Sequence, residues 1–377
     1  MKKKKMLFFY LRTGGGHISN ARTVADEISR SMPGRYDIKL VDALEGGEHL
    51  GKLILEDGYQ FTQNKAKWLY EFGYALTKIP AFARGTVDMT KIMVREYVKH
   101  VLEEEKPDKI VIFHGFIITG IEEAVRDLKL KIPVLTVVTD PFTSPNTWYA
   151  GKMTKYVVFS RRAFSCATKM GIAASRIKLI PNYIANPKYS TRLGKGEVSA
   201  LKKRLGFSEG KKVVLLLSGG EGLPNGKEIL RQVLMMRADD EVAVVCGKSE
   251  DFRKQAEALR KKYPGRNVKV YGFVDFVYEL INCADAVITK SGPSTLWEIL
   301  LQGKIPLIIS YTWEQEKGNM EFVVKNRVGL YEPEPKNVPD MINRALRDRR
   351  FASEFSRRLK KLKVGNGVRE TARYVVK

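Results

Sequence analysis

Hydroxyl, carboxylate and amide side chains gather between residues 286 and 319, next to two short apolar runs. The runs 286–289 and 305–310 are typical of strands that are buried on both faces. Between them, residues 290–295 read Lys-Ser-Gly-Pro-Ser-Thr and lead into a helical stretch over 296–301, whose N-terminus carries partial positive charge. The backbone and hydroxyls of this turn could therefore hold a phosphate group.

Two further groups in the same segment could bind a sugar. Glu298 lies in the first turns of the predicted helix, where a carboxylate can accept two hydrogen bonds from a ribose diol. The polar stretch 314–319 follows the second strand and offers amide and carboxylate groups to sugar hydroxyls. An ordinary strand-turn-helix-strand crossover, with Glu298 as a partner of the helix dipole, would leave the same pattern, so both interpretations stay open.

A glycine-rich loop with a histidine follows the first apolar run, 6–11. It reads Thr-Gly-Gly-Gly-His over 13–17, and its glycines let the backbone turn sharply and approach a ligand. The loop lacks the lysine of a Walker motif and the spacing of a dinucleotide fingerprint. His17 has an ordinary pKa near 6.5 and could accept a proton at neutral pH. A role in capping the next helix is the structural alternative.

The second half of the chain repeats this device. Ser-Gly-Gly-Glu-Gly follows the apolar run 213–218, and the backbone amides of such a loop could hold a diphosphate without a metal. Phe273 and Val274 follow the run 268–271, where a flat base could stack on the ring and bond to the Val274 backbone. The other three histidines are scattered, and no aspartate pair is placed to bind a metal-diphosphate. We therefore expect no catalytic metal.

Strand-like runs and helical patterns alternate along most of the chain, which predicts α/β architecture. The alternation stops at the proline-bracketed stretch 180–187 and then restarts, so we expect a linker near 181–190. Two doubly wound sheets in tandem leave a cleft between them, and ligands bind beyond the carboxyl ends of their strands. Both glycine-rich loops fall at such ends. The expected strand runs are 6–11, 110–113, 134–139, 156–159, 213–218, 242–246, 268–271, 286–289 and 305–310.

Size and charge narrow the class of protein. The chain has 377 residues, and its 66 basic against 42 acidic side chains give a net charge of +24. This charge predicts an anionic partner such as nucleic acid, anionic lipid or a phosphorylated substrate. No nucleic-acid-binding module, membrane-spanning run or signal peptide is visible, so we expect a cytoplasmic protein. The three separated cysteines suit reduced thiols. The basic run 344–377 fits either a solvated helix face or a membrane-facing one.

One region breaks the alternation. Residues 50–101 read as helices in which aromatic and basic side chains are interleaved. Such a pattern suits a bilayer interface, where rings lie at headgroup depth and lysines meet lipid phosphates. A helical insertion whose aromatic side chains cover the core is the alternative. The residues that we predict to contact a membrane are Lys65, Lys67, Trp68, Tyr70 and Phe72.

Taken in order, the motifs T-G-G-G-H, S-G-G-E-G, G-F-V and I-T-K-S-G-P-S-T-L-W-E with Q-E-x-G-N resemble glycosyltransferase family 28. Within it, the likeness is greatest to the monogalactosyldiacylglycerol synthases and processive diacylglycerol glucosyltransferases, and it spans most of the chain. The resemblance implies a GT-B fold with two Rossmann-like domains. We place the acceptor- and membrane-binding domain at 1–185 and the UDP-sugar-binding domain, with basic C-terminal helices, at 186–377.

The resemblance also implies roles for individual residues. His17 matches the catalytic histidine. The acceptor-side residues are Thr13, Gly14, Gly15, Gly16 and Asp140. The donor-binding residues are Gly219, Gly220, Glu221, Phe273, Val274, Ser291, Gly292, Ser294, Thr295, Glu298, Gln315, Glu316 and Asn319. Many relatives have an aspartate, assigned a base role, where this chain has Arg12, which strengthens His17 as the base, with Asp140 as a candidate assistant. Pro293 stands where relatives more often have a second glycine, which stiffens the turn.

The function implied is an inverting, metal-independent transfer of a hexose from a UDP-sugar to a lipid hydroxyl, with diacylglycerol as the first candidate. The UDP-sugar is a substrate, and no cofactor is expected. The enzyme would act at the cytoplasmic face of an anionic membrane as a peripheral protein, without binding nucleic acid. A polyprenyl-linked cell-wall intermediate or a soluble acceptor is the alternative substrate. A non-catalytic protein that binds nucleotide-sugars or nucleic acid is the alternative class, favoured only by the charge.

Overall fold

The computed structural model describes residues 3–12, 15–45, 80–220, 222–236 and 239–377. Clustering of the chain gives two compact units. The first comprises Met1–Ile184 together with Gly367–Lys377, and the second comprises Ala185–Asn366. The step from one unit to the other at Ile184 falls inside the linker that the sequence predicts.

The first unit is built on a six-stranded sheet in the order β2-β1-β3-β4-β5-β6, and all its neighbouring strands are parallel. The strands are β1 (Lys4–Tyr10), β2 (Tyr36–Asp42), β3 (Lys109–Ile112), β4 (Val134–Val137), β5 (Lys155–Val158) and β6 (Ile177–Leu179). The apolar runs that form β1, β3 and β4 are almost entirely buried, as expected for strands covered by helices on both faces. The chain winds outward from β1 in both directions, so the sheet is doubly wound.

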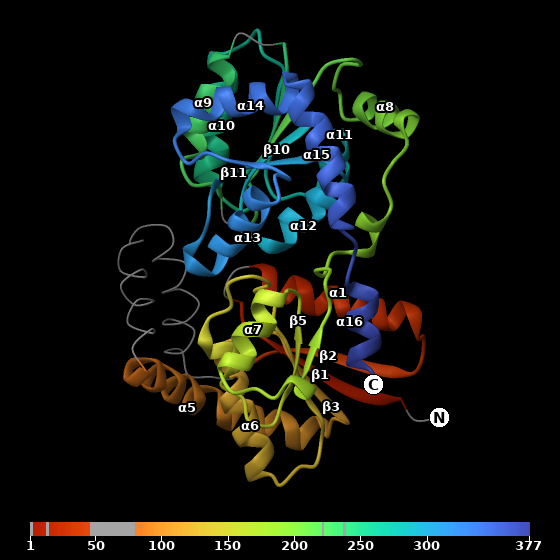
Figure 1. The fold of residues 1–377 in the computed structure, drawn as a ribbon, viewed down its shortest axis with the longest axis vertical. Helices are drawn as coiled ribbons and strands as arrows, with labels where there is room; N and C mark the ends of the chain where they lie inside the picture. Colours follow the sequence, from red (N-terminus) through yellow and green to blue (C-terminus); the bar gives the residue numbers. More distant parts are fainter. Residues whose placement is uncertain (1–2, 13–14, 46–79, 221, 237–238) are drawn as a thin grey trace. The chain divides into compact units, whose positions relative to one another are not determined.

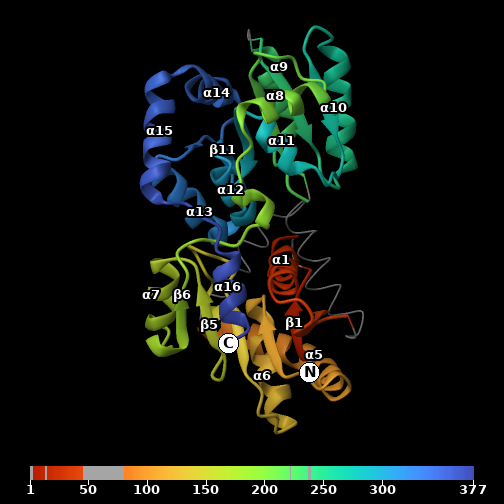
Figure 2. The same ribbon diagram turned by 90° about the vertical axis from the view of Figure 1, so that its right-hand side faces the viewer.

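Five α-helices accompany this sheet in the part of the unit that the structure describes. They are α1 (Gly15–Ser31), α5 (Pro80–Glu105), α6 (Ile118–Asp127), α7 (Arg161–Lys169) and α16 (Val368–Val375). Helix α5 packs on α6, and α1 packs on α16 (Figures 1 and 2). Helix α5 agrees with the helical character predicted for 50–101, but the predicted membrane residues 65–72 lie outside the described residues.

The C-terminal helix α16 differs from the sequence-based assignment, which places all of 186–377 in the second domain. Here Gly367–Lys377 belongs to the first unit. The reason is that α16 is amphipathic and buries Val368, Ala372 and Val375 against that unit. Its start is held because the Gly367 N–H donates to the Tyr183 carbonyl at 2.8 Å. A Cβ at this glycine would lie 1.9 Å from the Asn182 carbonyl oxygen, so only glycine allows the approach.

The second unit repeats the architecture. Its six parallel strands lie in the order β12-β11-β10-β7-β8-β9. The strands are β7 (Val213–Leu217), β8 (Glu241–Val245), β9 (Val268–Tyr271), β10 (Ala286–Lys290), β11 (Ile305–Ser310) and β12 (Leu330–Tyr331). The helices are α8 (Lys195–Arg204), α9 (Gly226–Met235), α10 (Glu250–Lys262), α11 (Val277–Cys283), α12 (Pro293–Leu301), α13 (Trp313–Lys325), α14 (Val338–Arg347) and α15 (Arg349–Leu362).

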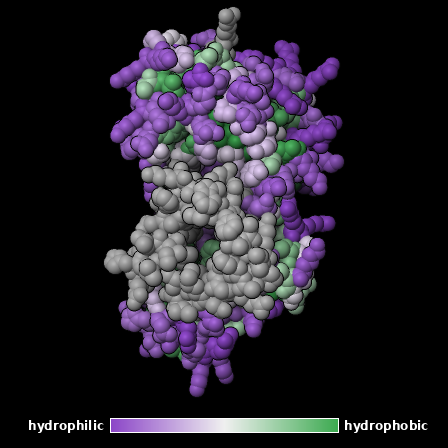
Figure 3. Space-filling model, turned by 90° about the vertical axis from the view of Figure 1, so that its left-hand side faces the viewer, coloured by the Kyte–Doolittle hydropathy of each residue, from purple (hydrophilic) through white to green (hydrophobic). Residues whose placement is uncertain are grey.

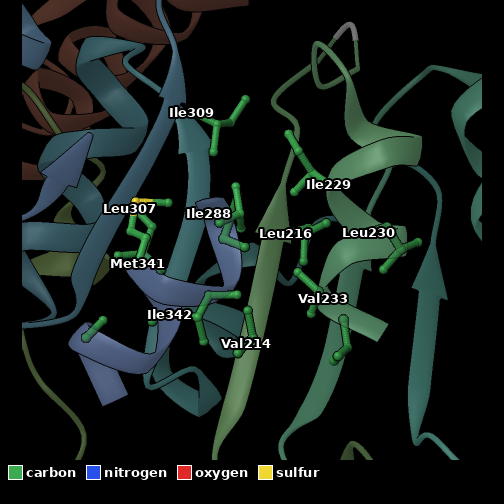
Figure 4. Close-up of a cluster of buried hydrophobic side chains, with 14 of the residues drawn as sticks. Val214, Leu216, Ile229, Leu230, Val233, Ile288, Leu307, Ile309, Met341 and Ile342 are labelled. Atoms are coloured by element: carbon green, nitrogen blue, oxygen red, sulfur yellow. The ribbon is translucent and has the colours of Figure 1, made fainter. Parts of the chain in front are cut away.

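Its core forms where helical side chains meet the sheet. In Figure 4, Ile229 and Val233 of α9 lie beside Val214 and Leu216 of β7. On the same face of the sheet, α14 packs on α9 and covers β10 and β11 with Met341 and Ile342. Each such side chain contributes about 1.5–3 kcal/mol when it is buried.

The predicted fold class is confirmed, since each of the nine expected strand runs coincides with a strand to within two residues at each end. Strands β2, β6 and β12 were not expected. The surface facing the viewer in Figure 3 is mainly hydrophilic over the described residues, with hydrophobic residues in small groups. Across the described chain, none of the helices combines the length and the apolar character needed to cross a bilayer.

Candidate functional site

The first unit brings three chain segments together at the topological switch point of its sheet, where the order of the strands along the chain reverses. Strands β1 and β3 are neighbours, but the chain leaves β1 toward β2 and leaves β3 toward β4. The loops that follow their carboxyl ends therefore diverge, which is where open α/β sheets bind ligands. His17 lies in the first turn of α1 after β1, His114 follows β3, and Thr139 and Asp140 follow β4.

His17 is held by polar contacts on both of the neighbouring segments. Its Nδ1 lies 2.7 Å from the Thr139 hydroxyl oxygen, and a hydrogen bond joins the ring to the Phe113 backbone. Burial lowers the pKa of His17 to about 4, against a smaller upward effect of the Phe113 hydrogen bond. The imidazole is therefore neutral at pH 7 and has a lone pair that can accept a proton.

Asp140 is also buried, and its carboxylate accepts a hydrogen bond of 2.7 Å from the Trp148 indole N–H. Trp148 lies in the 3₁₀ turn η3 (Asn146–Tyr149), with its ring 6.1 Å from that of His17. The side chain that contacts His17 Nδ1 is thus that of Thr139, the residue before Asp140. Assistance of His17 by Asp140 stays a prediction.

Arg12, for which the family resemblance implies an aspartate, pairs with a carboxylate. Its Nε lies 2.9 Å from Oδ2 of Asp42, at the end of β2. Gly15 and Gly16 start α1 with open space where a Cβ would stand, so a ligand can approach the backbone. Thr13 and Gly14 lie outside the described residues.

The sheet of the second unit has its topological switch point between β7 and β10. Gly219 and Gly220 follow β7, and Ser291 and Gly292 connect β10 to α12. Nothing stands within 4 Å of a Cβ built on Gly220. Ser294, near the start of α12, has a buried hydroxyl with no hydrogen-bond partner among the described residues. Open backbone and an unpaired hydroxyl at a helix N-terminus suit a phosphate. Thr295 is the next residue of the helix, and Glu221 lies outside the described residues.

Glu298 lies one turn further along α12. Burial raises the pKa of its carboxyl to about 7, against the opposing effects of Lys188 and of a hydrogen bond from Tyr189. Both partners belong to the 3₁₀ turn η5 (Pro187–Ser190), which is tied to α12 because Gln302 Nε2 donates to the Tyr189 carbonyl at 2.7 Å. The environment thus makes this carboxyl easier to protonate than an ordinary glutamate.

The predicted sugar-binding residues lie in the first turns of α13, next to the turn that connects β10 to α12. Glu316 accepts the Thr312 N–H at 2.6 Å and lies 3.4 Å from Lys290 Nζ. Asn319 donates to the Ser291 carbonyl at 2.9 Å, while its buried Oδ1 has no hydrogen-bond partner in the described chain. Ser291 is itself fully buried, and its hydroxyl donates to the Glu316 carbonyl at 3.0 Å. These contacts join α13 to the turn before α12.

Gln315, which precedes Glu316, is partly buried. Phe273 follows β9 with its ring 70% exposed, and Lys248 Nζ lies 5.9 Å from the ring centroid. Val274 is the next residue. A large exposed aromatic ring beside a cation is suited to stacking against a planar ligand.

Several residues of these sites were not expected from the sequence. In the first unit they are His114, Thr139 and Trp148, and in the second they are Lys188, Tyr189 and Lys290. Position at the end of an expected strand run or directly after it was the available signal for His114, Thr139 and Lys290. Trp148 and the η5 residues gave no such signal, because only tertiary packing brings them to the site.

Comparison with known proteins gives a family match for each unit. Residues 17–180 match the family model of monogalactosyldiacylglycerol (MGDG) synthase, and residues 222–368 match that of the glycosyltransferase family 28 C-terminal domain. Over both units the chain resembles the glycosyltransferases of family 28. It is 26% identical over 360 residues to monogalactosyldiacylglycerol synthase of Spinacia oleracea, and 26% identical over 358 residues to synthase 1 of Arabidopsis thaliana. Both alignments cover 90% of this chain but only 66% and 64% of those relatives, just under two thirds of their length.

Solved structures confirm the GT-B fold of this chain. Anabaena HepE in complex with UDP-glucose matches with a TM-score of 0.61 at 15% identity, covering 99% of each chain. MurG of Acinetobacter baumannii matches with a TM-score of 0.62 at 14% identity, again covering 99% of each chain. At these identities the likeness concerns the fold alone.

Proposed function

We propose that this protein transfers a hexose from a UDP-sugar to a lipid hydroxyl, with diacylglycerol as the first candidate acceptor. The observation that carries the proposal is the half-buried, neutral His17, placed where the strand order reverses in the unit that matches MGDG synthase. The family 28 match of the second unit supports the donor class, as does the fold that the whole chain shares with HepE, which was solved in complex with UDP-glucose.

In this proposal His17 accepts the proton of the acceptor hydroxyl while the hydroxyl oxygen bonds to the anomeric carbon. The bond between that carbon and the UDP oxygen breaks in the same displacement, so the anomeric configuration inverts. A general base of this kind contributes about 10²–10⁴-fold to the rate. The positive end of α12 and the Lys290 ammonium would stabilise the departing UDP, which supports a reaction without metal.

Donor recognition follows from the second unit. Glu298 would bind the ribose diol, and Phe273 with the Val274 backbone would bind uracil. The loop at Gly219 and Gly220 and the turn from Ser291 to Thr295 would hold the diphosphate, with the unpaired Ser294 hydroxyl as a donor. Gln315, Glu316 and Asn319 would face the sugar, where Asn319 Oδ1 is available as an acceptor.

A donor-by-acceptor panel with mass detection of the product tests the proposal. We expect a UDP-hexose and diacylglycerol to give a glycolipid and UDP, with activity that persists in EDTA. His17→Ala should lower kcat by about 10²–10⁴-fold without changing UDP affinity. Near-normal transfer by His17→Ala would show that another group is the base, and a product only with polyprenyl-linked or soluble acceptors would replace diacylglycerol.

We further propose that an anionic membrane surface is a partner, and helix α15 supports this. The helix buries Phe351, Phe355 and Leu359 on one side. Within the described chain, no ion pair or hydrogen bond engages the cationic groups of Arg349, Arg350, Arg357, Lys360, Lys361 and Lys363. The three arginines of this set line a shallow hollow together with Ser353 and Glu354. Clustered cations near a membrane surface contribute about 1 kcal/mol each to binding of anionic lipid.

Sedimentation with vesicles of anionic and of neutral lipid tests this surface. Replacing Arg349, Arg350 and Arg357 by alanine should weaken binding to anionic vesicles by at least about tenfold and reduce its salt dependence. The matched control removes the same charge from α10, at Lys254, Lys261 and Lys262. Equal losses from the two triple variants would mean that net charge alone, and not α15, determines the binding.

A further inference from the structure

Two histidines from different elements lie against each other in the first unit. His17 is in α1, and His114 immediately precedes the 3₁₀ turn η2 (Gly115–Ile117). Their ring centroids are 4.5 Å apart, and their planes meet at 70°, an edge-to-face arrangement. The pairing of β1 with β3 brings the elements that carry these side chains together.

A backbone hydrogen bond determines where His114 carries its proton. The Phe116 N–H donates to His114 Nδ1 at 3.3 Å, so His114 serves as the N-cap of η2. A ring nitrogen that accepts a hydrogen bond carries no proton, and the neutral ring is therefore protonated at Nε2. Protonation of Nδ1 would break the cap.

The ring of His114 is also closely packed. The residue is 6% exposed, and the rings of Phe116 and Trp148 lie 5.3 and 6.1 Å away. Gly115 makes room for Trp148, since a Cβ there would stand 3.1 Å from the Trp148 backbone nitrogen. Burial holds the pKa of His114 well below its usual range, and repulsion by His17 in its protonated form lowers that pKa further.

On its other side, His17 meets a chain of hydrogen bonds. Its Nδ1 contacts the Thr139 hydroxyl at 2.7 Å, and the Tyr183 hydroxyl donates to the Thr139 carbonyl at 2.7 Å. Asn20 donates in turn to the Tyr183 hydroxyl at 2.8 Å. His17 therefore lies between a fixed hydroxyl and a fixed ring, which together restrict its rotation.

We propose that His114 is a positioning residue, whose ring holds the His17 imidazole in the one orientation in which its hydrogen bonds to Thr139 and the Phe113 backbone select a single tautomer. The functional consequence rests on the proposed role of His17 as the base. The coupling between the two rings does not depend on that role and can be measured without substrate.

Two variants of His114 distinguish the effect of its ring from the effect of its N-cap hydrogen bond. His114→Asn keeps a side chain that favours the N-cap position but removes the ring. His114→Phe keeps a ring but leaves the Phe116 N–H without its acceptor. His100→Asn changes an exposed histidine of α5 and is the matched control. UDP binding reports whether the second unit stays folded in each variant.

Long-range ¹H–¹⁵N spectra of the imidazole groups read the His17 tautomer directly. We expect His114→Asn to change His17 from one tautomer to a mixture, and to lower kcat by about 10–100-fold with the acceptor KM within about threefold. His114→Phe should preserve the tautomer but lower the melting temperature.

A His114→Asn variant with unaltered His17 signals and unaltered kcat would overturn the proposal, because the cap alone would then explain His114. If His17→Ala keeps normal transfer while His114→Asn still changes the His17 tautomer, the coupling stands and the assignment of His17 as the base fails. The two results are therefore distinguishable.

Discussion

At the scale of single residues, burial shifts two titratable groups so that both favour their neutral forms. The pKa of His17 is lowered to about 4, and the pKa of Glu298 is raised to about 7. Each shift is driven first by desolvation, which penalises the charged form of either type of group. The shifts give different pH predictions for the acceptor and donor sites.

For His17, the expected effect is on the rate profile. The imidazole stays unprotonated until the pH approaches 4, so kcat/KM for the acceptor at saturating UDP-sugar should stay level from pH 8 to about 5.5 and fall only below that. Initial rates across this range, with circular dichroism as a check on folding, make the measurement. A fall centred on pH 6.5 would contradict a base whose pKa is lowered to about 4.

For Glu298, the expected effect is on stability. Its folded pKa of about 7 exceeds the ordinary value of 4.5, so the folded state keeps a proton that the unfolded chain loses between these values. The stabilising contribution is complete below pH 4.5 and is lost as the pH rises through 7. Glu298→Gln should therefore be more stable than the natural chain at pH 8 by about 1–3 kcal/mol, but not at pH 4.5.

Urea unfolding at both pH values measures this difference. Glu334→Gln, a change of an exposed glutamate in the same unit, should show no gain. We expect the same Glu298 variant to bind UDP about 10–100-fold more weakly, because the ribose diol loses a carboxylate acceptor. A variant that binds UDP normally would remove Glu298 from the proposed donor site.

At the scale of elements, the loops after β7 and β8 are held together by a glycine. Gly247 has a φ of +62°, and a Cβ there would lie 2.2 Å from the Gly219 carbonyl oxygen. The next residue, Lys248, donates its N–H to the Gly220 carbonyl at 3.0 Å. The proposed diphosphate loop therefore keeps its position only if residue 247 has no side chain.

Gly247→Ala should displace this loop and lower UDP affinity at least about tenfold, through a clash added to about 1 kcal/mol of backbone strain. Gly210→Ala is a matched control, because Gly210 has a φ of +78° with nothing within 4 Å of a Cβ. Calorimetric titration with UDP should show normal affinity for the control. Equal losses in both variants would assign the effect to general destabilisation.

At the scale of the whole molecule, the second unit ends at Asn366, and residues 367–377 belong to the first unit. The chain returns to the first unit through α16, whose apolar face packs on α1. Arg369 and Glu370 add ion pairs to Glu27 and Lys178 of that unit, at 3.8 and 2.8 Å. Helix α16 should therefore stabilise the first unit and not the second.

Ala372→Glu tests this assignment, since it buries a charge at a position that is 1% exposed. We expect it to destabilise the first unit by several kcal/mol while UDP binding by the second persists. Arg373→Glu, a change at the exposed neighbouring position, should leave both properties nearly unaltered. Loss of UDP binding in Ala372→Glu alone would place α16 with the donor unit instead.

Features that depend on local pattern were predictable from the sequence. Alternating apolar runs and helical stretches predict the strands, because a strand buried on both faces needs a continuous apolar run. The carboxyl ends of those strands locate His17, Gly219 and the turn at Ser291. Strands β2 and β12 escaped prediction because their side chains are only partly buried, so that their apolar content is weaker.

Features that depend on packing between distant segments were decided by the tertiary structure. The pairing of His17 with His114 and Thr139, the η5 partners of Glu298 and the return of α16 all join residues far apart in the chain. The protonation states follow from the same packing, since desolvation depends on what surrounds a group and not on its neighbours in sequence. The sequence alone therefore determined which groups stand at the strand ends, and the fold determined their charge and orientation.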